Sequence, residues 1–237
     1  MSIVNVSIQY NKKIAMDHKQ KIKTTGVILA SGEGSRLKTL SKTLGVPKHL
    51  FPIGNATIIT RIANELHQSC DELLCITKES YLPQYREAFK LLPFAIKVIS
   101  KEAPGFRGDF MATKEAKYDH IVLTVGDLIF PEGELTRFVT LAKSKDPKAL
   151  ICLDQGQLKK LDMRIIMASY PKSLLSEVLP LNPESLASMS FAFLKNFLRD
   201  RVALALSKTL FNINTEESYQ KAKEFFSSNK NKNKKGE

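Results

Sequence analysis

The order of apolar segments along the chain predicts an α/β fold, in which helices cross over between the strands of a parallel sheet. Six short runs rich in β-branched or other apolar residues are typical of buried strands, and amphipathic helical patterns lie between several of them. Alternation of strand and helix favours parallel pairing. The runs are apolar throughout rather than alternating, as expected for strands that are covered on both faces.

The predicted elements follow in chain order. The expected strands are residues 26–30, 73–77, 96–99, 121–125, 149–153 and 164–168. The expected helices are residues 57–68, 81–91 and 134–143, followed by a long apolar helix over residues 184–206. In the first of these helices Ile58, Ile62 and Leu66 fall on one face, which would pack on the sheet.

The length of 237 residues suits one domain with extensions. We expect a basic N-terminal extension at residues 1–23 and a folded domain over residues 24–228. Residues 229–237 are rich in lysine and asparagine, a composition typical of a disordered tail.

The formal net charge is +12, and much of it lies at the two ends. Residues 1–23 carry five lysines against one aspartate, and residues 229–237 carry four lysines against one glutamate. The body is only mildly basic, which suits an anionic substrate such as a nucleotide. It has no aromatic-rich basic motif of the kind that binds single strands, so we expect no nucleic-acid partner.

The chain has no apolar run that approaches the ~20 residues needed to span a bilayer, and its N-terminus lacks the order of a secretory signal. We therefore expect a cytoplasmic protein with no membrane partner. Cys70, Cys75 and Cys152 show no metal-ligand spacing and are expected to be buried thiols. The four histidines are expected to be structural or to lie at the surface, and the sequence indicates no oligomeric state.

The strongest functional signal is the exit of the first strand, Gly26-Val-Ile-Leu-Ala-Ser-Gly-Glu-Gly-Ser-Arg-Leu37. A buried strand runs into a loop with Gly32 and Gly34, which let a ligand approach the backbone closely. Consecutive exposed N–H groups in such a loop form an anion-binding nest at the ligand edge of the sheet. The dinucleotide and P-loop fingerprints both fail, because Leu37 stands where a third glycine belongs and no Gly-Lys-Ser/Thr closes the loop.

Two cations follow these glycines at short range. The guanidinium of Arg36 can fork onto phosphate oxygens, and Lys48 follows Pro47 in the segment Pro-Lys-His-Leu-Phe-Pro. The proline fixes the chain direction before the lysine. We expect both cationic side chains to hold phosphates and to face a solvent-filled cleft.

These two motifs together resemble the signature of the nucleotidyltransferases, which include the sugar-1-phosphate nucleotidylyltransferases and the molybdopterin- and inositol-phosphate-type NTP transferases. The resemblance implies a Rossmann-like three-layer sandwich of the nucleotide-diphospho-sugar transferase (GT-A-like) type. It implies catalytic roles for Arg36 and Lys48 on the phosphates. It also implies that the nucleotide lies against Leu29, Ala30, Ser31, Gly32, Glu33, Gly34 and Ser35.

Asp127, which follows Gly126 at the end of an apolar run, is the expected metal ligand. A carboxylate just past a buried strand lies at the ligand edge of the sheet and is a hard oxygen donor. The resemblance implies that it binds Mg²⁺, with a second contact at Asn214, where many relatives carry aspartate. An amide oxygen ligates Mg²⁺ more weakly. Thr215 would cap the helix that follows.

Residues 101–110 occupy the place where relatives carry a glycine-rich turn for base recognition, so Gly105 and Gly108 are expected to contact the nucleotide. Asp109 stands where small residues are commoner, which leaves the base unassigned. Residues 154–207, where an acceptor would be chosen, match no motif of the family.

We therefore expect a Mg²⁺-dependent enzyme that transfers a nucleoside monophosphate from an NTP to a phosphorylated small molecule, a sugar or polyol phosphate, and releases pyrophosphate. The phosphate of the acceptor is already an anion, so no general base is required. Two alternatives stay open. One is a GT-A glycosyltransferase, which would use a nucleotide-sugar donor, and the other is a catalytically weak nucleotide-binding regulatory protein.

Overall fold

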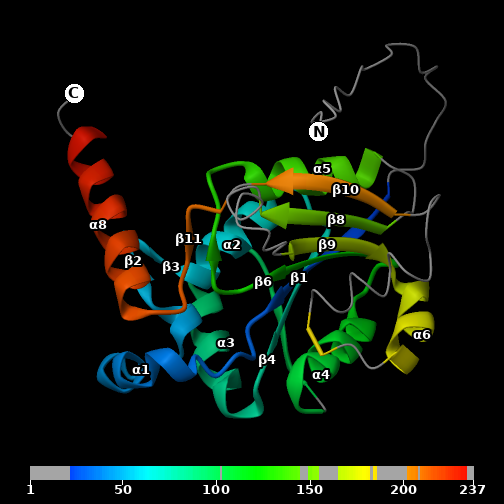
Figure 1. Cartoon of the computed structure of the whole chain (residues 1–237), viewed down its shortest axis with the longest axis horizontal. Coiled ribbons are helices and arrows are strands. Elements are labelled where there is room, and N and C mark those ends of the chain that lie inside the picture. The colour runs from blue at the N-terminus through cyan, green and yellow to red at the C-terminus, as the bar shows by residue number, and fades with distance from the viewer. Residues whose placement is uncertain are drawn as a thin grey trace, which may run out of the picture.

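The computed structural model describes residues 22–101, 103–144, 149–154, 165–181, 184–185, 202–207 and 209–233. Its centre is a seven-stranded sheet in the order β10-β8-β9-β6-β1-β4-β5 (Figure 1). These strands are β1 (Thr24–Leu29), β4 (Glu72–Thr77), β5 (Lys97–Ser100), β6 (His120–Val125), β8 (Ala149–Asp154), β9 (Ile165–Pro171) and β10 (Val202–Ser207). Two short antiparallel pairs lie outside the sheet: β2 (Pro52–Ile53) with β3 (Ala56–Thr57), and β7 (Leu128–Ile129) with β11 (Phe211–Asn212).

Helices and short 3-10 turns connect the strands. The helices are α1 (Lys38–Leu44), α2 (Ile58–His67), α3 (Leu82–Lys90), α4 (Gly105–Ala112), α5 (Glu134–Ser144), α6 (Leu175–Val178) and α8 (Glu216–Asn233). The 3-10 turns are η1 (Ser35–Leu37), η2 (Lys48–Leu50), η3 (Glu79–Tyr81), η4 (Thr113–Glu115), η6 (Lys172–Leu174) and η7 (Leu179–Leu181).

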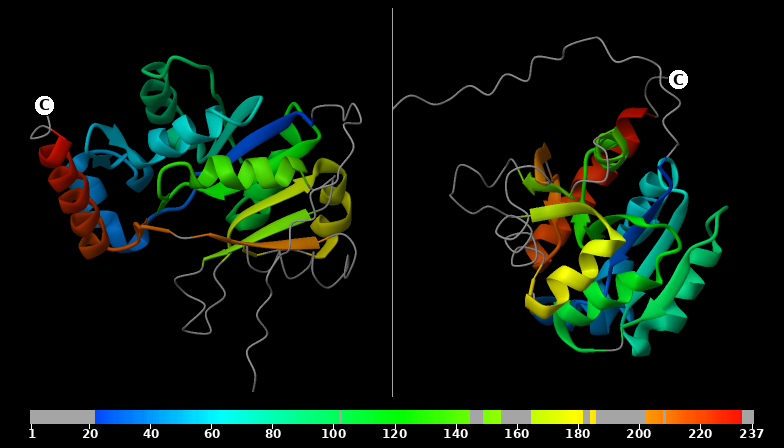
Figure 2. Two further views of the ribbon diagram at one scale, coloured as in Figure 1. Left: turned by 90° about the horizontal axis from the view of Figure 1, so that it is seen from above. Right: turned by 90° about the vertical axis from the view of Figure 1, so that its right-hand side faces the viewer.

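The sheet is covered on both faces, which makes the fold a three-layer sandwich (Figure 2). Along β1, Val27 and Leu29 pack in the hydrophobic cluster that includes α4 and α6, whereas Ile28 packs in the cluster that includes α2, α3 and α5. All three side chains are buried. This two-sided burial explains why the strand sequences are apolar throughout, and the predicted three-layer α/β fold is confirmed.

The sheet is not wholly parallel, and here the prediction was wrong for one strand. β9 pairs antiparallel with both β6 and β8, whereas the other neighbouring strands are parallel. Only residues 155–164 separate β8 from β9, which is less than the dozen or so residues that a parallel crossover requires. The short separation therefore accounts for the reversed strand.

Local capping explains where two helices begin. The hydroxyl of Thr57 accepts a hydrogen bond from the backbone N–H of Thr60 at 3.3 Å, and the hydroxyl of Thr60 accepts one from the N–H of Thr57 at 3.0 Å. This capping box starts α2 at Ile58. Likewise, the Thr215 hydroxyl accepts from the N–H of Ser218 at 3.1 Å, and α8 begins at Glu216, as predicted.

The predicted helix over residues 184–206 is wrong at its C-terminal end. Residues 202–206 belong to β10, which pairs in parallel with β8, and residues 186–201 lie outside the described part of the chain. A run such as Val-Ala-Leu-Ala-Leu has no period that separates a short strand from a buried helix. The free edge of β8 decides in favour of the strand.

The structure differs from the prediction at the C-terminal end of the chain. Residues 1–21 of the predicted basic extension lie outside the described residues, as do residues 234–237 of the predicted tail. Residues 229–233, which were expected to be disordered, continue α8 to Asn233. Within the described residues, no helix combines the length and the apolar character that a membrane span needs.

Candidate functional site

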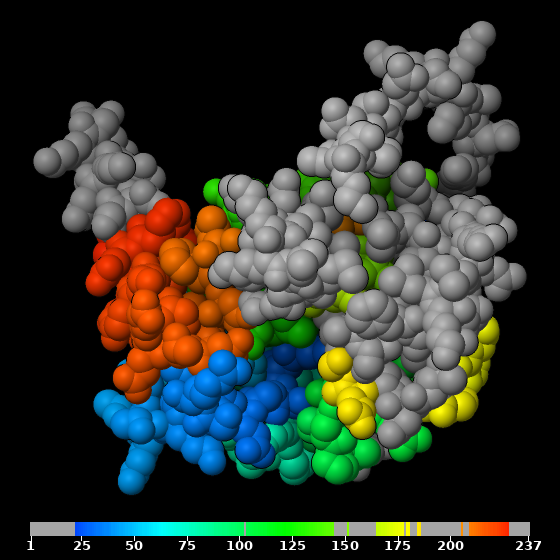
Figure 3. All heavy atoms as spheres, in the orientation of Figure 1, coloured from blue at the N-terminus to red at the C-terminus, as the bar shows by residue number. Residues whose placement is uncertain are grey.

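The glycine loop leaves β1 at the edge where the parallel strands end. In the space-filling view a hollow lies beside it, between the blue segment of α1 and the green segment of α4 (Figure 3). Gly34 has a φ of 60°, in the left-handed region that glycine favours. A Cβ at Gly34 would lie 3.1 Å from Cδ of Lys48, so the bare backbone also makes room for the lysine stem. Gly32 and Glu33 are exposed, which leaves the loop open to a ligand.

Lys48 reaches from η2 to a carboxylate and an amide. Its Nζ donates to Oδ2 of Asp127 at 2.6 Å and to Oδ1 of Asn214 at 3.0 Å. The side chain is only 7% exposed, and that of Asp127 is 18% exposed. The expectation that Lys48 faces a solvent-filled cleft is therefore wrong, because the glycine loop and its two partners enclose it.

Gly126 and Asp127 follow β6 directly and cross close to the end of β1. The backbone N–H of Gly126 donates to the carbonyl of Leu29 at 2.8 Å. A Cβ at Gly126 would lie 2.9 Å from that carbonyl oxygen, so this approach requires glycine. The carbonyl of Asp127 in turn accepts from the N–H of Ile213 at 2.9 Å, which fixes the segment that carries Asn214.

The donor set at this point fits a hard cation. One carboxylate oxygen and one amide oxygen converge on the Lys48 ammonium, which is itself a cation held between them. Oxygen ligands of this kind suit Mg²⁺ or Mn²⁺. In the described part of the chain no three His, Cys, Asp or Glu side chains gather as a metal cluster. A metal ion held here would therefore need further oxygens from its substrate.

Arg36 is not part of this contact network. It lies on η1 and is exposed, and it has no hydrogen-bond or ion-pair partner among the described residues. The structure thus brings Lys48, Asp127 and Asn214 together, while Arg36 is a free cation at the solvent side of the loop.

A second polar cluster, not anticipated from the sequence, ties the glycine loop to α4. The hydroxyl of Ser31 donates to Oδ2 of Asp109 at 2.7 Å and accepts from Nζ of Lys101 at 2.9 Å. The same Nζ lies 3.4 Å from both carboxylate oxygens of Asp109. Burial raises the pKa of the Asp109 carboxyl above its ordinary value, and the hydrogen bond from Ser31 and the charge of Lys101 oppose that rise.

One signal for this cluster was present in the sequence. Asp109 stands between Gly108 and Phe110 in a helix whose neighbouring aromatic residues are buried or half-buried, and it is itself only 6% exposed. A buried carboxylate needs partners, so a charged residue on an otherwise apolar helix face indicates a polar contact inside the protein.

Gly105 and Gly108 lie in the first turn of α4. Gly105 has a φ of 71° and its carbonyl accepts from Lys101 Nζ at 3.1 Å. A Cβ at Gly108 would lie 1.8 Å from the carbonyl oxygen of Ala103, so only glycine fits there. The positive φ of Gly105 and the close contact at Gly108 thus account for these glycines, and their predicted contact with a nucleotide stays a prediction.

His49 lies next to Lys48 but is not placed as a proton carrier. Its Nδ1 lies 2.7 Å from the hydroxyl of Tyr85 inside the core. Burial, followed by the charge of Lys48, lowers the pKa of His49 to about 3, so the ring is neutral at pH 7. His49 is therefore structural, in agreement with the sequence analysis.

The family model of the MobA-like NTP transferase domain matches residues 26–203 of the chain. The chain belongs to this family. The match includes the glycine loop, Lys48 and Asp127, and it ends before Asn214. Membership makes the protein one of the nucleotidyltransferases.

Solved structures similar to this NTP transferase domain share its fold. A putative glucose-1-phosphate thymidylyltransferase from Bacillus anthracis superposes with a TM-score of 0.71 at 18% identity, covering 86% of this chain and 95% of the other. The inositol-1-phosphate CTP transferase from T. maritima gives a TM-score of 0.66 at 16% identity, covering 88% and 96%. At these identities the likeness shows the fold alone.

A curated relative is similar over part of its length. The chain is 29% identical over 132 residues to the bifunctional protein GlmU of Methanococcus aeolicus, which is 54% of this chain and 29% of that relative. The NTP transferase domain described here thus spans less than a third of the length of that protein.

Proposed function

We propose that this NTP transferase transfers a nucleoside monophosphate from an NTP to a sugar or polyol phosphate and releases pyrophosphate. The observation that carries the proposal is the convergence of Lys48, Asp127 and Asn214 beside an exposed glycine loop, in a chain that belongs to the MobA-like family. The named activities of the Bacillus anthracis and T. maritima proteins support this class of acceptor.

The reaction needs charge neutralisation and positioning rather than a covalent intermediate. An oxygen of the acceptor phosphate bonds to the α-phosphorus of the NTP while the bond from that phosphorus to pyrophosphate breaks. The backbone N–H groups around Gly32 and Gly34 would cradle the triphosphate, and Arg36 and Lys48 would offset the charge that grows on the leaving pyrophosphate. The attacking phosphate is already anionic, and buried His49 is not needed as a base.

We further propose that Asp127 and Asn214 hold Mg²⁺ during the reaction. Bound Mg²⁺ would neutralise phosphate oxygens and hold the two reacting groups together. With one carboxylate and one amide as protein ligands, the free protein would bind the ion weakly, and the triphosphate would complete its shell. We also infer a cytoplasmic location, since Cys70 and Cys75 are free thiols, as is typical of a reducing compartment.

A pyrophosphate-release screen of the four NTPs against a panel of sugar and polyol phosphates tests the proposal. We expect one NTP to release pyrophosphate only with a phosphorylated acceptor, and the Asp127→Asn variant to be inactive with the same pair. A glycosyltransferase would instead release a nucleoside diphosphate from a nucleotide-sugar. Nucleotide binding without release from any pair would favour the regulatory alternative and contradict the proposal.

A further inference from the structure

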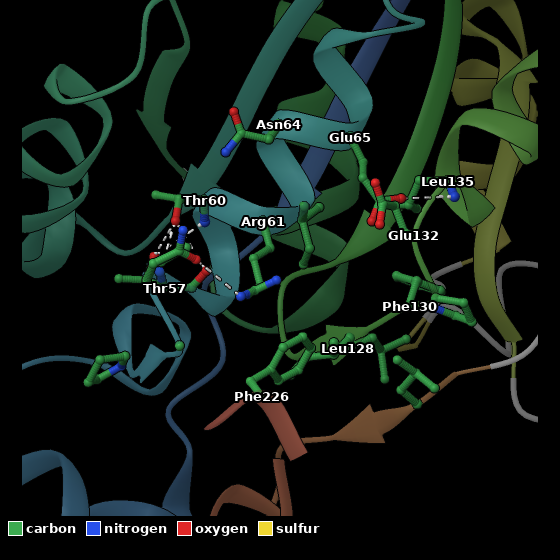
Figure 4. A pocket seen from close by; sticks show the side chains of 18 of the residues that line it. Thr57, Thr60, Arg61, Asn64, Glu65, Leu128, Phe130, Glu132, Leu135 and Phe226 are labelled. Atoms are coloured by element: carbon green, nitrogen blue, oxygen red, sulfur yellow. Dashed lines mark hydrogen bonds between the residues drawn. The ribbon is translucent and has the colours of Figure 1, made fainter. Parts of the chain in front are cut away.

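A cavity of about 1180 Å³ lies between α2, the β2–β3 hairpin, β7 and α8 (Figure 4). Its lining includes none of Arg36, Lys48, Asp127 and Asn214, so it is separate from the candidate site. The volume is slightly above the ~300–1,000 Å³ usual for small-molecule pockets. The cavity is therefore large enough for a small organic ligand.

Part of the cavity lining is apolar, and some of its hydrophobic side chains are exposed. Among the described residues four large hydrophobic side chains are exposed, and three of them, Leu91, Leu210 and Phe225, line this cavity. Leu91 is 85% exposed. Leu91 follows α3, whereas Leu210 and Phe225 lie beside β11, where the N–H of Leu210 donates to the carbonyl of Ile129 at 2.8 Å and the ring of Phe225 packs edge-on against Phe211. The exposed apolar surface that a single small ligand would cover is therefore the one formed by Leu210 and Phe225.

The other part of the wall is acidic. The side chains of Glu65 and Glu132 point toward the same part of the cavity (Figure 4), and the charge of Glu132 acts on Glu65. Glu65 Oε2 accepts a single hydrogen bond, from the N–H of Leu135 at 3.3 Å. Within the described ranges neither carboxylate has an ion-pair partner. Partial burial, with the charges of Glu132 and Glu134, raises the pKa of Glu65 to about 7, against the Leu135 hydrogen bond and the charge of Arg61.

The guanidinium of Arg61, which also lines the cavity, is already engaged. Its Nε and Nη2 donate to the carbonyl of Ile53 at 3.3 and 3.2 Å, and its Cζ lies 4.1 Å from the centre of the Phe226 ring. Arg61 is thus occupied and does not form an ion pair with Glu65. Within the described residues Glu65 and Glu132 thus have no ion-pair partner, and the charge of Arg61 opposes the rise of the Glu65 pKa only in part.

We propose that this cavity binds a small organic cation with an apolar body, of the aryl- or alkylammonium class. The ammonium group would pair with Glu65 and Glu132, and the apolar body would cover Leu210 and Phe225. The same carboxylates disfavour an organic anion of similar shape. This assignment does not depend on the proposed transferase activity.

Tryptamine is a suitable probe, because the chain contains no tryptophan and the indole fluorescence then reports on the ligand alone. We expect a saturable rise in the fluorescence anisotropy of tryptamine with the full-length protein. Indole-3-propionate has the same ring with a carboxylate in place of the ammonium group on its side chain, and it should show no rise. Glu65→Gln should weaken tryptamine binding about tenfold, and Glu132→Gln should weaken it less. Glu79→Gln, an exposed glutamate outside the cavity lining, is the matched control and should change nothing.

The affinity should also depend on pH in one direction. A bound cation favours ionised Glu65, whose carboxyl faces Glu132, Glu134 and Arg61, so binding should tighten between about pH 6 and pH 8 in the wild type and stay flat in Glu65→Gln. The proposal is overturned if tryptamine, phenethylamine and octylamine all fail to bind saturably. The proposal is equally overturned if Glu65→Gln and Glu132→Gln both bind these amines with the affinity of the wild type. Because no turnover is measured, either result leaves the proposed transferase function untouched.

Discussion

In the free protein the ammonium group of Lys48 occupies the point where the side-chain oxygens of Asp127 and Asn214 converge. A metal ion that uses these oxygens must displace it, because two cations at one carboxylate repel each other. A bound triphosphate would draw the lysine away and bring oxygens of its own. We therefore expect the metal ion to enter with the nucleotide rather than before it.

Replacing Lys48 by methionine separates its two effects. Lys48→Met should increase the affinity of the nucleotide-free protein for Mn²⁺, since Asp127 loses its resident cation. It should also slow turnover, because losing one preorganised electrostatic donor raises the activation free energy by about 2–4 kcal/mol. Mn²⁺ titration followed by electron paramagnetic resonance measures the first effect. Arg36→Met is the control, and should slow turnover without changing metal affinity; equal Mn²⁺ affinity in the Lys48 variant and the wild type would refute this account.

At the scale of elements, the ends of β1 and β6 and the start of α4 are held together by close backbone approach and by one buried polar cluster. Gly126 brings β6 within hydrogen-bond distance of Leu29 on β1. Ser31, Asp109 and Lys101 join the loop after β1 to α4 and to the residue after β5. The loop that would hold the triphosphate is thus positioned from two sides before any ligand binds.

Two glycine substitutions test the close approach at the strand ends. Gly126→Ala should lower the free energy of unfolding by about 1–3 kcal/mol, because its Cβ would meet the backbone of Leu29. Gly32→Ala is the matched control: its Cβ would meet no atom closer than 3.8 Å, and its stability should be near that of the wild type. Urea unfolding of both variants gives the comparison. Equal stabilities would mean that the β1–β6 crossing is looser than described.

A double-mutant cycle measures the polar cluster. Ser31→Ala and Asp109→Ala should each destabilise the protein, because each leaves a buried polar group without its partner. If the Ser31–Asp109 hydrogen bond is made as described, the pair should show a coupling energy of about 0.5–3 kcal/mol. Chemical unfolding of the wild type, the two single variants and the double variant measures this coupling energy. Strictly additive effects would show that the two side chains do not interact.

For the whole molecule, the sequence predicted best what is local in the chain. The glycine loop follows directly from β1, and Lys48 and Asp127 each lie just beside an apolar segment, so spacing and strand ends were enough to place them on one edge of the sheet. Ser31 and Asp109 are far apart in sequence, and so are His49 and Tyr85. Asp109 on an apolar helix face indicates a buried polar contact but does not name its partner, and only the packed sheet shows which residues meet.

Direction and length of elements were harder to predict than their presence. β9 has the composition of any buried strand, and only the short stretch before it signals that it runs antiparallel. α8 continues through lysine- and asparagine-rich residues because it has already been started by the Thr215 cap and held by Tyr219 and Phe226 against the body. Composition alone therefore underestimates the length of a helix whose first turns are anchored.

The basic N-terminal extension should be dispensable for chemistry. β1 begins at Thr24, whose N–H donates to Oδ2 of Asp71 at 2.9 Å, so the sheet is anchored from that residue onward. A fragment of residues 22–233 should keep its fold and turn over within about tenfold of the full chain, or about 1.4 kcal/mol. Circular dichroism and steady-state kinetics check this. A fragment that folds but loses far more than tenfold in turnover would show that the deleted ends contribute to catalysis.

The most direct test of the central claim is the Asp127→Asn variant, compared with the wild type in Mg²⁺ titrations with an NTP present and in turnover. The substitution keeps the shape of the side chain and removes the negative charge that would hold the cation. The account predicts much weaker binding of the Mg²⁺–nucleotide complex, turnover lower by several orders of magnitude and an intact fold, since a substrate-bridging ion contributes little to folding. Binding and turnover equal to those of the wild type would contradict it, and would reduce Asp127 to a turn residue at the end of β6.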